Sequence, residues 1–545
     1  MSKDKASEAS DSPQAGELNR RELLVKAGAV GVGAVAAGSL AGGAKAASRS
    51  YRATPIKRGG RLIWGLESDP VHVAPFGQIL SAGHWAKELS YDSLVEWDRN
   101  LNVKPALAAS FKIVSKTEIL WTLKKGVKFH NGKELTADDV VYSVGKMLNP
   151  PLPGSVSTTA QVPAIAGADA VSKYVVRLRL KQPDARVIGF FAWGRYAPIV
   201  PEGLYESGLN VARNAIGTGP YKMTGFNPND RVELTANQSF WKTGLPYMDA
   251  ITMKTLTDEQ ARVAALRAGA IDGCTLSVDV ARSLANVSDL VVLKGPNAAF
   301  RELQMTLKLG ETKPWDDQRV RLAVMHAIDR ADIIKRVYSG EAEYSGFVPP
   351  GYGPWPLTDA ELKQKYQKFD LPMAKKLMAD AGFAKGFSVT MTTFASQDYP
   401  QTSAVVQSQL KKINIDVNIV AQEAGTFAAN NGKGSFDWDL TGRGMRGDVD
   451  GYVAEFHPAA AVFKIWYPEY KNVKAWRGIG NGRIQLDPAK RLPIYQAAQR
   501  ELLLNPVQIP LVAIKKYQVV NKRVQGMYVA FSDFNPGLRT VWLNG

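Results

Sequence analysis

The stretch from residue 387 to residue 419 constrains the fold more than any other part of the chain. Apolar and polar side chains alternate over residues 387–393, and they alternate again over residues 413–419. Residues 403–411, between these two runs, have the pattern of a helix. The expected order is therefore strand, helix, strand. Such a unit implies a right-handed crossover and a parallel strand pair, and it predicts an α/β fold.

A second segment, residues 119–142, predicts a strand, a turn and a helix in that order. Its strand carries alternating apolar side chains at Ile119, Trp121 and Leu123. Asn131 and Gly132 form a dipeptide that tolerates positive φ and therefore favours a turn. Thr136 and Asp139 have the spacing of a capping box, so we expect a helix to begin directly after Thr136.

Composition limits the classes of function. The chain has 545 residues, of which 45% are hydrophobic, so we expect at least three subdomains with large cores. The formal net charge is +17, but the basic residues are dispersed and do not interleave with aromatic ones, which argues against a nucleic-acid partner. Cys274 is the single cysteine, and the 5 histidines are scattered. We therefore expect no disulfide, no metal site and no cofactor.

Residues 1–47 have the pattern of a twin-arginine signal peptide. Arg20 and Arg21 precede an uncharged run rich in Ala, Gly and Val, residues 27–43, and residues 44–46 supply the small side chains of a cleavage site. The uncharged run is too short and too rich in glycine for a stable membrane-spanning helix. No cysteine lies near the cleavage site. We expect a mature protein that is free in the periplasm and is not a lipoprotein.

Three segments together resemble a known family. They read WTLKKGVKFHNGKELTADDVVYS at residues 121–143, AIGTGPYKMTGF at residues 215–226 and DQRVRLAVMHAIDR at residues 317–330. In this order they are similar to the patterns of family 5 of the extracytoplasmic solute-binding proteins of ABC transporters, the peptide, opine and nickel-binding family. The resemblance covers about residues 60–545. It implies the α/β two-lobe fold of periplasmic binding proteins, with a hinge and an extra subdomain in the first lobe.

The resemblance also implies a division of the chain. Lobe I would comprise residues 60–92, 216–295 and 508–545, the extra subdomain residues 93–215, and lobe II residues 296–507. The chain would then pass between the lobes near residues 295 and 508, and two passages make a hinge. A small-molecule or peptide ligand would be buried in the cleft by closure of the lobes. The expected partners are the ABC permease subunits at the inner membrane, and we expect a monomer without enzymatic activity.

The resemblance places ligand contacts after the predicted strand at residues 436–440. Asp448 lies where peptide-binding relatives use a carboxylate for the α-ammonium group of the ligand, and a carboxylate buried on closure favours a cationic partner. Aromatic faces that pack against ligand groups are expected in the same lobe. The predicted ligand-binding residues are Asp448, Arg443, Arg446, Met445, Trp466 and Tyr467.

Departures from the family pattern bear on the ligand. Met445 replaces the usual tryptophan, and Arg443 and Arg446 add positive charge. A simple dipeptide or oligopeptide is therefore less favoured, and an opine-like or other amino-acid-derived solute becomes plausible. Alternatives of the same fold are an oligosaccharide binder and a binder of nickel, haem or another metal complex. A periplasmic hydrolase is the alternative from another class, although the chain has no G-x-S-x-G motif and no histidine set with metal-ligand spacing.

Overall fold

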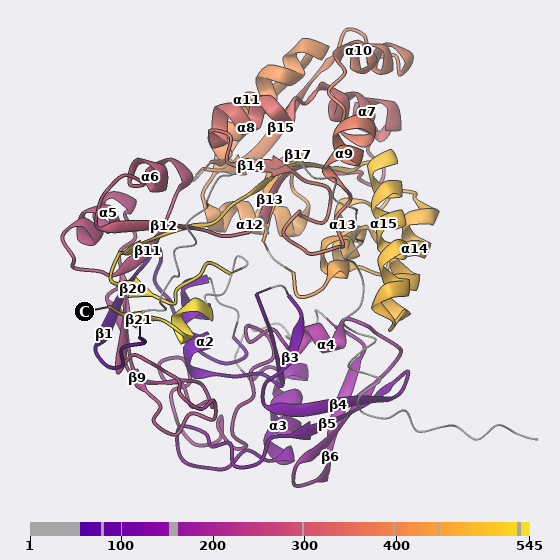
Figure 1. Ribbon diagram of the computed structural model, residues 1–545. Coiled ribbons are helices and arrows are strands. Elements are labelled where there is room, and N and C mark those ends of the chain that lie inside the picture. Colours follow the sequence, from indigo (N-terminus) through magenta and orange to yellow (C-terminus); the bar gives the residue numbers. More distant parts are fainter. Residues whose placement is uncertain are drawn as a thin grey trace, which may run out of the picture. The chain divides into compact units, whose positions relative to one another are not determined.

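The computed structural model describes most of the chain beyond the predicted signal peptide (Figure 1). Residues 1–47 and Met445 lie outside the described residues. The compact unit considered below is Ile56–Gly545. The described residues are 55–77, 81–99, 101–151, 162–296, 299–395, 398–444, 446–530 and 536–544.

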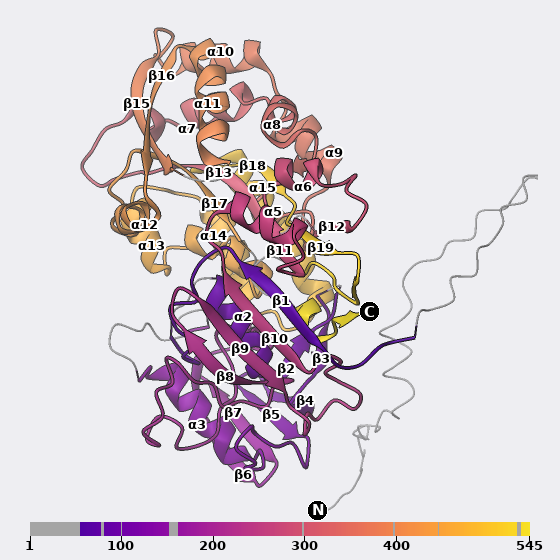
Figure 2. The same cartoon turned by 90° about the vertical axis from the view of Figure 1, so that its left-hand side faces the viewer.

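The first sheet joins three stretches that are far apart in the sequence. Its strand order is β12-β19-β11-β1-β10-β9-β8, and β1 lies parallel to both β10 and β11 (Figure 2). Helices α2 (Ser81–Ser90), α5 (Glu259–Arg267) and α6 (Val278–Ser283) belong to this part of the molecule. The strands are β1 (Arg61–Leu66), β8 (Tyr221–Asn227), β9 (Arg231–Ala236), β10 (Ala250–Thr255), β11 (Gly273–Leu276), β12 (Leu290–Lys294) and β19 (Tyr517–Asn521).

The second sheet contains the predicted strand–helix–strand unit. Strands β15 and β16 pair in parallel, and helix α11 (Tyr399–Leu410) connects them, so this prediction is confirmed. Strand β17 is also parallel to β15. The strand order is β14-β18-β13-β17-β15-β16. The strands are β13 (Ala299–Met305), β14 (Ala342–Tyr344), β15 (Phe387–Phe394), β16 (Ile415–Gln422), β17 (Trp438–Arg443) and β18 (Gln508–Ile514).

Strand pairing moves one predicted boundary. The sequence division begins the last part of lobe I at residue 508, but β18 pairs with β13 and β14 of the second sheet. The next strand, β19, pairs with β11 and β12 of the first sheet. The chain therefore passes from the second sheet to the first after Ile514. Both closing strands are apolar, so composition alone could not separate them.

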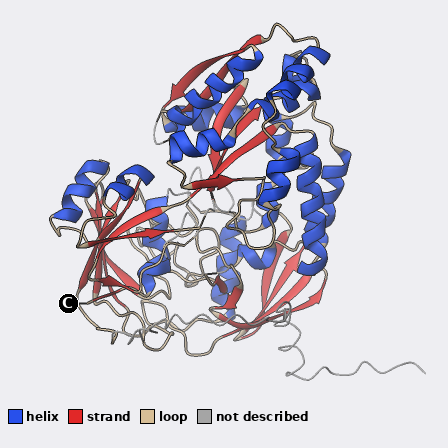
Figure 3. Cartoon of the chain, turned by 45° about the horizontal axis from the view of Figure 1, so that its top comes forward, coloured by secondary structure: helices blue, strands red, loops and turns tan. Residues whose placement is uncertain are grey.

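The long segments that connect the strands of the second sheet form helices, which pack around it (Figure 3). Asp329 accepts hydrogen bonds from the backbone N–H groups of Ala331 and Asp332, at 3.0 and 3.2 Å, and so caps the start of α8. The larger helices are α7 (Gln318–Ala327), α8 (Arg330–Tyr338), α10 (Leu371–Asp380), α12 (Ala424–Lys433), α13 (Ala461–Trp466), α14 (Val473–Ile484) and α15 (Pro488–Leu504). Among the described helices, none is both long enough and apolar enough to cross a membrane.

The third sheet lies within the predicted extra subdomain and has its own core. Its strand order is β4-β5-β7-β6, with β4 (Ala108–Ser115), β5 (Glu118–Leu123), β6 (Ile165–Ser172) and β7 (Val175–Leu180). Thr136 and Asp139 form the predicted capping box at the start of α3 (Ala137–Leu148). The short helix α4 (Val187–Phe190) follows β7. Buried apolar side chains cluster separately around each of the three sheets, as expected for bodies that fold around their own cores.

Candidate functional site

The carboxyl ends of the parallel strands in the second sheet bring the predicted ligand loop to one edge. Strands β15, β16 and β17 end at Phe394, Gln422 and Arg443. In an open α/β sheet, this edge is where ligands are bound. The loop after β17, residues 444–450, leaves from this edge and includes three of the residues predicted from the sequence, and a fourth, Arg443, lies at its base.

Asp448 is bound by the chain itself. The Arg491 guanidinium donates to both carboxylate oxygens, at 2.7 and 2.6 Å, and the backbone N–H of Asp450 donates to the same carboxylate at 2.8 Å. Burial acts to raise the pKa of Asp448, but Arg491 outweighs it and holds the pKa below its usual value. The carboxylate is therefore charged and already paired. Its role as the partner of a ligand ammonium group stays a prediction.

Arg443 is directed into its own lobe rather than toward open space. Its guanidinium donates to Glu302 at 2.7 Å and to Gln508 at 2.8 Å, and it forms a further ion pair with Glu455. Arg443 is 5% exposed and Glu302 is fully buried. Burial raises the pKa of Glu302 even though Arg443 opposes this effect. The Arg443 charge is thus used to hold strands β13, β17 and β18 together.

The remaining described members of the predicted set also have structural contacts. The backbone of Arg446 accepts a hydrogen bond from the Tyr352 hydroxyl at 2.8 Å. The Trp466 indole N–H donates to the carbonyl of Asn431 at 2.7 Å, and the Tyr467 hydroxyl accepts from Gln508 at 2.6 Å. Both rings are buried in the core of the second lobe. The sequence favoured them as aromatic faces for ligand contact, whereas Trp466 ends α13 and both rings pack inside the lobe.

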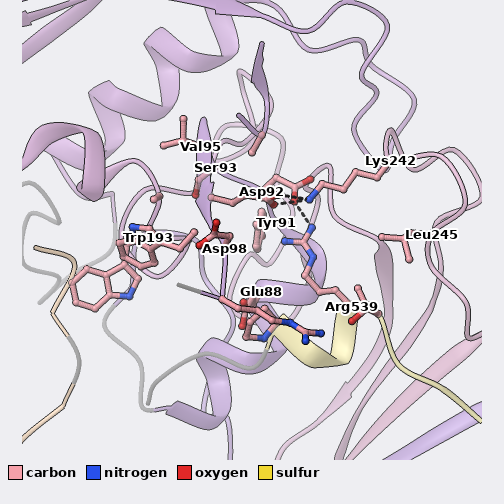
Figure 4. Close-up of a pocket in the computed structure, with 18 of the residues that line it drawn as sticks. Glu88, Tyr91, Asp92, Ser93, Val95, Asp98, Trp193, Lys242, Leu245 and Arg539 are labelled. Carbon is pink, nitrogen blue, oxygen red and sulfur yellow. Dashed lines mark hydrogen bonds and ion pairs between the residues drawn. The ribbon is translucent and has the colours of Figure 1, made fainter. Parts of the chain in front are cut away.

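A pocket of about 320 Å³ lies in the other part of the molecule (Figure 4). Its charged side chains form pairs: Asp92 with Arg539, and Glu96 with Lys242 at 2.6 Å. Asp92 also accepts from the Trp241 indole at 2.8 Å and the Thr218 hydroxyl at 2.9 Å. Aromatic rings complete the wall, and the ring centroids of Trp97 and Trp193 lie 6.2 Å apart. The lining includes Asp92, Glu96, Trp97, Trp193, Lys242 and Arg539.

Four polar groups of the same lining are buried without a hydrogen-bond partner in the described structure. They are Nδ1 of His84, Oη of Tyr91, Oγ of Ser93 and Nε1 of Trp193. Burial lowers the pKa of His84 well below its usual value, and Lys87 adds to this effect, so the imidazole is neutral. Buried polar groups are almost always satisfied in a native protein. The pocket wall therefore has bonding capacity that water or a bound molecule can meet.

The loop and the pocket meet at two glycines. A Cβ atom on Gly447 would lie 2.6 Å from Cε3 of Trp193, so only glycine lets the loop approach this ring so closely. A Cβ atom on Gly189 would lie 2.6 Å from the Gly447 carbonyl oxygen. The loop predicted from sequence thus abuts a wall that sequence reasoning missed. The aromatic stretch FFAWGRY at residues 190–196 was the available signal.

Metal binding has no geometric support in the part of the chain that the structure describes. There, no group of three or more His, Cys, Asp or Glu side chains is arranged to hold an ion. The only cysteine of the sequence, Cys274, is buried, and burial raises the pKa of its thiol to about 12.

Comparison with known proteins defines the family. The model of the bacterial extracellular solute-binding proteins, family 5, matches residues 102–460, and the chain belongs to this family. The glutathione-binding protein GsiB of Salmonella choleraesuis is 28% identical over 465 residues, which cover 81% of this chain and 86% of that protein. GsiB of Escherichia coli O157:H7 is 27% identical over the same share of both chains. The chain is thus a solute-binding protein of an extracytoplasmic family.

Solved structures define the fold. DppA from Helicobacter pylori, in complex with the peptide STSA, is similar with a TM-score of 0.75 and 23% identity over 90% of this chain and 99% of that one. AgaA from A. tumefacien R10, in complex with agropinic acid, has a TM-score of 0.75 and 24% identity over 89% and 99%. The predicted two-lobe periplasmic-binding-protein fold is confirmed. At these identities the likeness concerns the fold alone.

Proposed function

We propose that this chain is the substrate-binding subunit of an ABC importer that captures a small amino-acid-derived solute and delivers it to a membrane permease. The observation that carries the proposal is the contact of the 444–450 loop with Trp193, because that ring lines the 320 Å³ pocket. A pocket of this size lies at the lower end of the range typical of small-molecule sites, which is roughly 300–1,000 Å³. The names of similar proteins, which bind glutathione, a peptide and agropinic acid, support the class of solute.

The chemistry of the pocket suits a solute with charges of both signs. Its lining mixes acidic and basic side chains with aromatic rings. Ser93 and Trp193 offer hydrogen-bond donors to the carbonyl or carboxylate oxygens of such a solute, and the rings of Trp97 and Trp193 pack against its apolar parts. An amino-acid derivative or small peptide carries charges of both signs, carbonyl or carboxylate oxygens, and apolar parts.

The residues predicted from the sequence take two kinds of role in this proposal. Arg446, which precedes Gly447 in the loop, forms the second wall of the site. Asp448, Arg443, Trp466 and Tyr467 act behind that wall, because Arg491, Glu302, Asn431 and Gln508 already engage them. They position the loop and keep the lobe rigid.

The proposal includes export and assembly. The signal peptide at residues 1–47 directs the protein to the periplasm by the twin-arginine route, and the mature protein is a free monomer that meets permease subunits at the inner membrane. It has no cofactor and performs no covalent chemistry. Replacing Arg20 and Arg21 together by lysine is expected to leave the precursor in the cytoplasm, as fractionation would reveal.

Native mass spectrometry of the freshly purified protein tests the solute class, because a closed binding protein retains its ligand. A thermal-shift panel then compares glutathione, tripeptides, opines, disaccharides and nickel–histidine. A bound amino-acid derivative raises the melting temperature by mass action. A shift with a disaccharide or nickel–histidine alone contradicts the proposal, as does turnover of a peptide or ester by the purified protein.

A further inference from the structure

A buried ion pair joins the extra subdomain to the loop after β17. Nη1 of Arg186, just before α4, lies 3.0 Å from Oδ2 of Asp450. The Asp450 side chain is fully buried, and the Arg186 side chain is 13% exposed. A backbone hydrogen bond of 2.8 Å runs beside the pair, from the N–H of Ala185 to the carbonyl of Arg483. Two parts of the chain with separate cores are thus bonded next to the candidate site.

Each member of the pair is also held within its own part of the molecule. Asp184 accepts from the Arg186 guanidinium with both oxygens, at 2.8 and 2.5 Å. Asp450 accepts from Arg483 at 2.9 Å and from the Tyr495 hydroxyl at 2.8 Å. Both side chains are therefore preoriented toward one another by residues of their own lobe, which lowers the entropy lost when they pair.

The nearby backbones are complementary at the same place. Gly189 of α4 faces the carbonyl of Gly447, and its missing side chain is what allows this approach. The contact, the ion pair and the backbone hydrogen bond therefore share one seam, formed by residues 184–189 on one side and residues 447–450 and 483 on the other.

We propose that Arg186 and Asp450 form a latch that holds the two lobes closed over the solute. The inference rests on the proposed solute capture, because a latch has a function only if the lobes separate. Arg186 is a positioning residue and touches no solute. It acts by lengthening the time for which the closed form persists.

The partners that stay behind make the latch reversible. When the seam opens, Arg186 keeps Asp184, and Asp450 keeps Arg483 and Tyr495. Opening therefore leaves neither charge without a counter-charge, which avoids the large penalty of an unpaired buried ion. Burial acts to lower the pKa of Arg186, but Asp184 and Asp450 raise it above its usual value, so the guanidinium stays charged.

Distance measurements between two spin labels test the latch without knowledge of the solute. Cysteines replace the exposed Lys112 and Lys474, one in each part of the molecule, and Cys274→Ser removes the native thiol. The full mature protein is dialysed to remove any copurified solute. The matched control for Arg186→Met is Arg179→Met, because Arg179 pairs with Asp169 inside the third sheet at 2.7 Å.

We expect Arg186→Met to lower the ratio of short to long label–label distances by about threefold or more. A change of this size is within the strength of a partly buried ion pair. Arg179→Met should leave the ratio unchanged. Gly189→Ala, which is compatible with a helix, is expected to act in the same direction by preventing close approach. Unchanged distances in both Arg186→Met and Gly189→Ala would overturn the latch, and so would a parent protein without a short-distance population. No added solute is involved, so failure of the solute panel is a separate result.

Discussion

The loop after β17 and the wall of the pocket differ in how completely their polar groups are satisfied. In the loop, Asp448 and Asp450 each have an arginine of the second lobe as a partner. In the wall, Ser93 and Trp193 carry buried donors without a partner in the described structure. The charged loop residues, which look functional in the sequence, thus form ion pairs within the protein. Uncharged polar groups of the pocket wall keep unused hydrogen-bonding capacity.

This difference separates two kinds of contribution. An ion pair whose groups are fully hydrogen-bonded holds a loop in place, and breaking it lowers the free energy of unfolding. A buried donor without a partner lowers the stability of the free protein, and this cost is offset only when a bound solute accepts its hydrogen bond. We therefore expect substitutions in the loop to change the free energy of unfolding, and substitutions in the wall to change affinity.

The largest expected effect comes from Arg491→Met. This change leaves the Asp448 carboxylate without its bidentate partner. Breaking a buried pair in this way typically costs about 3–5 kcal/mol of stability, and we expect about 3 kcal/mol because the Asp448 side chain remains partly exposed. Urea unfolding followed by circular dichroism measures it.

The double variant Arg491→Met with Asp448→Asn provides the control for this prediction. Removing the orphaned charge should recover more than half of the lost stability, because asparagine keeps the shape of aspartate without its charge. If the double variant is less stable than Arg491→Met alone, Asp448 is stabilised by something other than Arg491, and the loop is not held in the manner described.

Asp439 sharpens the comparison, because it is a buried carboxylate with an amide instead of an arginine as partner. Asn431 donates to it at 2.8 Å, and burial raises the pKa of Asp439 from 3.8 to about 7. The folded-state pKa lies above the unfolded value, so the unfolded chain releases this proton first. The contribution of Asp439 to stability is therefore complete below about pH 4 and declines as the pH rises toward 7.

Asp439→Asn removes this titration. We expect the variant to gain on the order of 2–4 kcal/mol relative to the parent at pH 8, and close to nothing at pH 4, as judged by urea unfolding at both values. Asp437→Asn, at a partly exposed position in the same segment, is the matched control for replacing an aspartate by asparagine. Equal differences at pH 4 and pH 8 would mean that Asp439 is ionised throughout this range.

Periodicity predicted much of the fold, because apolar burial imposes it. Val389, Met391 and Val417 alternate toward the core, and their strands pair in parallel as expected. The passage between the lobes was misplaced by one strand because β18 and β19 are both apolar over most of their length. Periodicity says which face is buried, but it does not say which sheet a strand joins.

The site was harder to predict than the fold. The family resemblance suggested that Asp448 and Arg446 face a ligand, which stays a prediction. The resemblance did not indicate that Asp448 pairs with Arg491, 43 residues further along the chain. Trp193 and Ser93 come from two other segments. The aromatic run at residues 190–196 was the available signal, but such a run does not by itself distinguish a pocket wall from a core. Long-range pairing decides which polar groups are satisfied, and a single sequence does not record it.

The smallest effect is expected in the wall, where Trp193→Phe removes one N–H donor and keeps most of the aromatic surface. If Nε1 donates to a solute oxygen in the closed form, its loss should reduce affinity by about 1–2 kcal/mol, roughly 5- to 30-fold, as measured by calorimetry with the solute identified by mass spectrometry. Stability without solute should fall by no more than about 0.5 kcal/mol, because the deleted donor has no partner there and the removed ring atoms line a pocket rather than a closed core.

Trp64→Phe is the matched control, because Trp64 also carries a buried indole N–H without a partner in the described structure but lies in the core of the first sheet. That variant should alter stability and leave affinity unchanged. If both variants bind as the parent does, water satisfies the Trp193 donor in the bound form and the solute is recognised elsewhere. If Trp193→Phe loses stability rather than affinity, the wall behaves as the loop does, and the distinction between satisfied and unsatisfied groups does not separate structure from recognition in this protein.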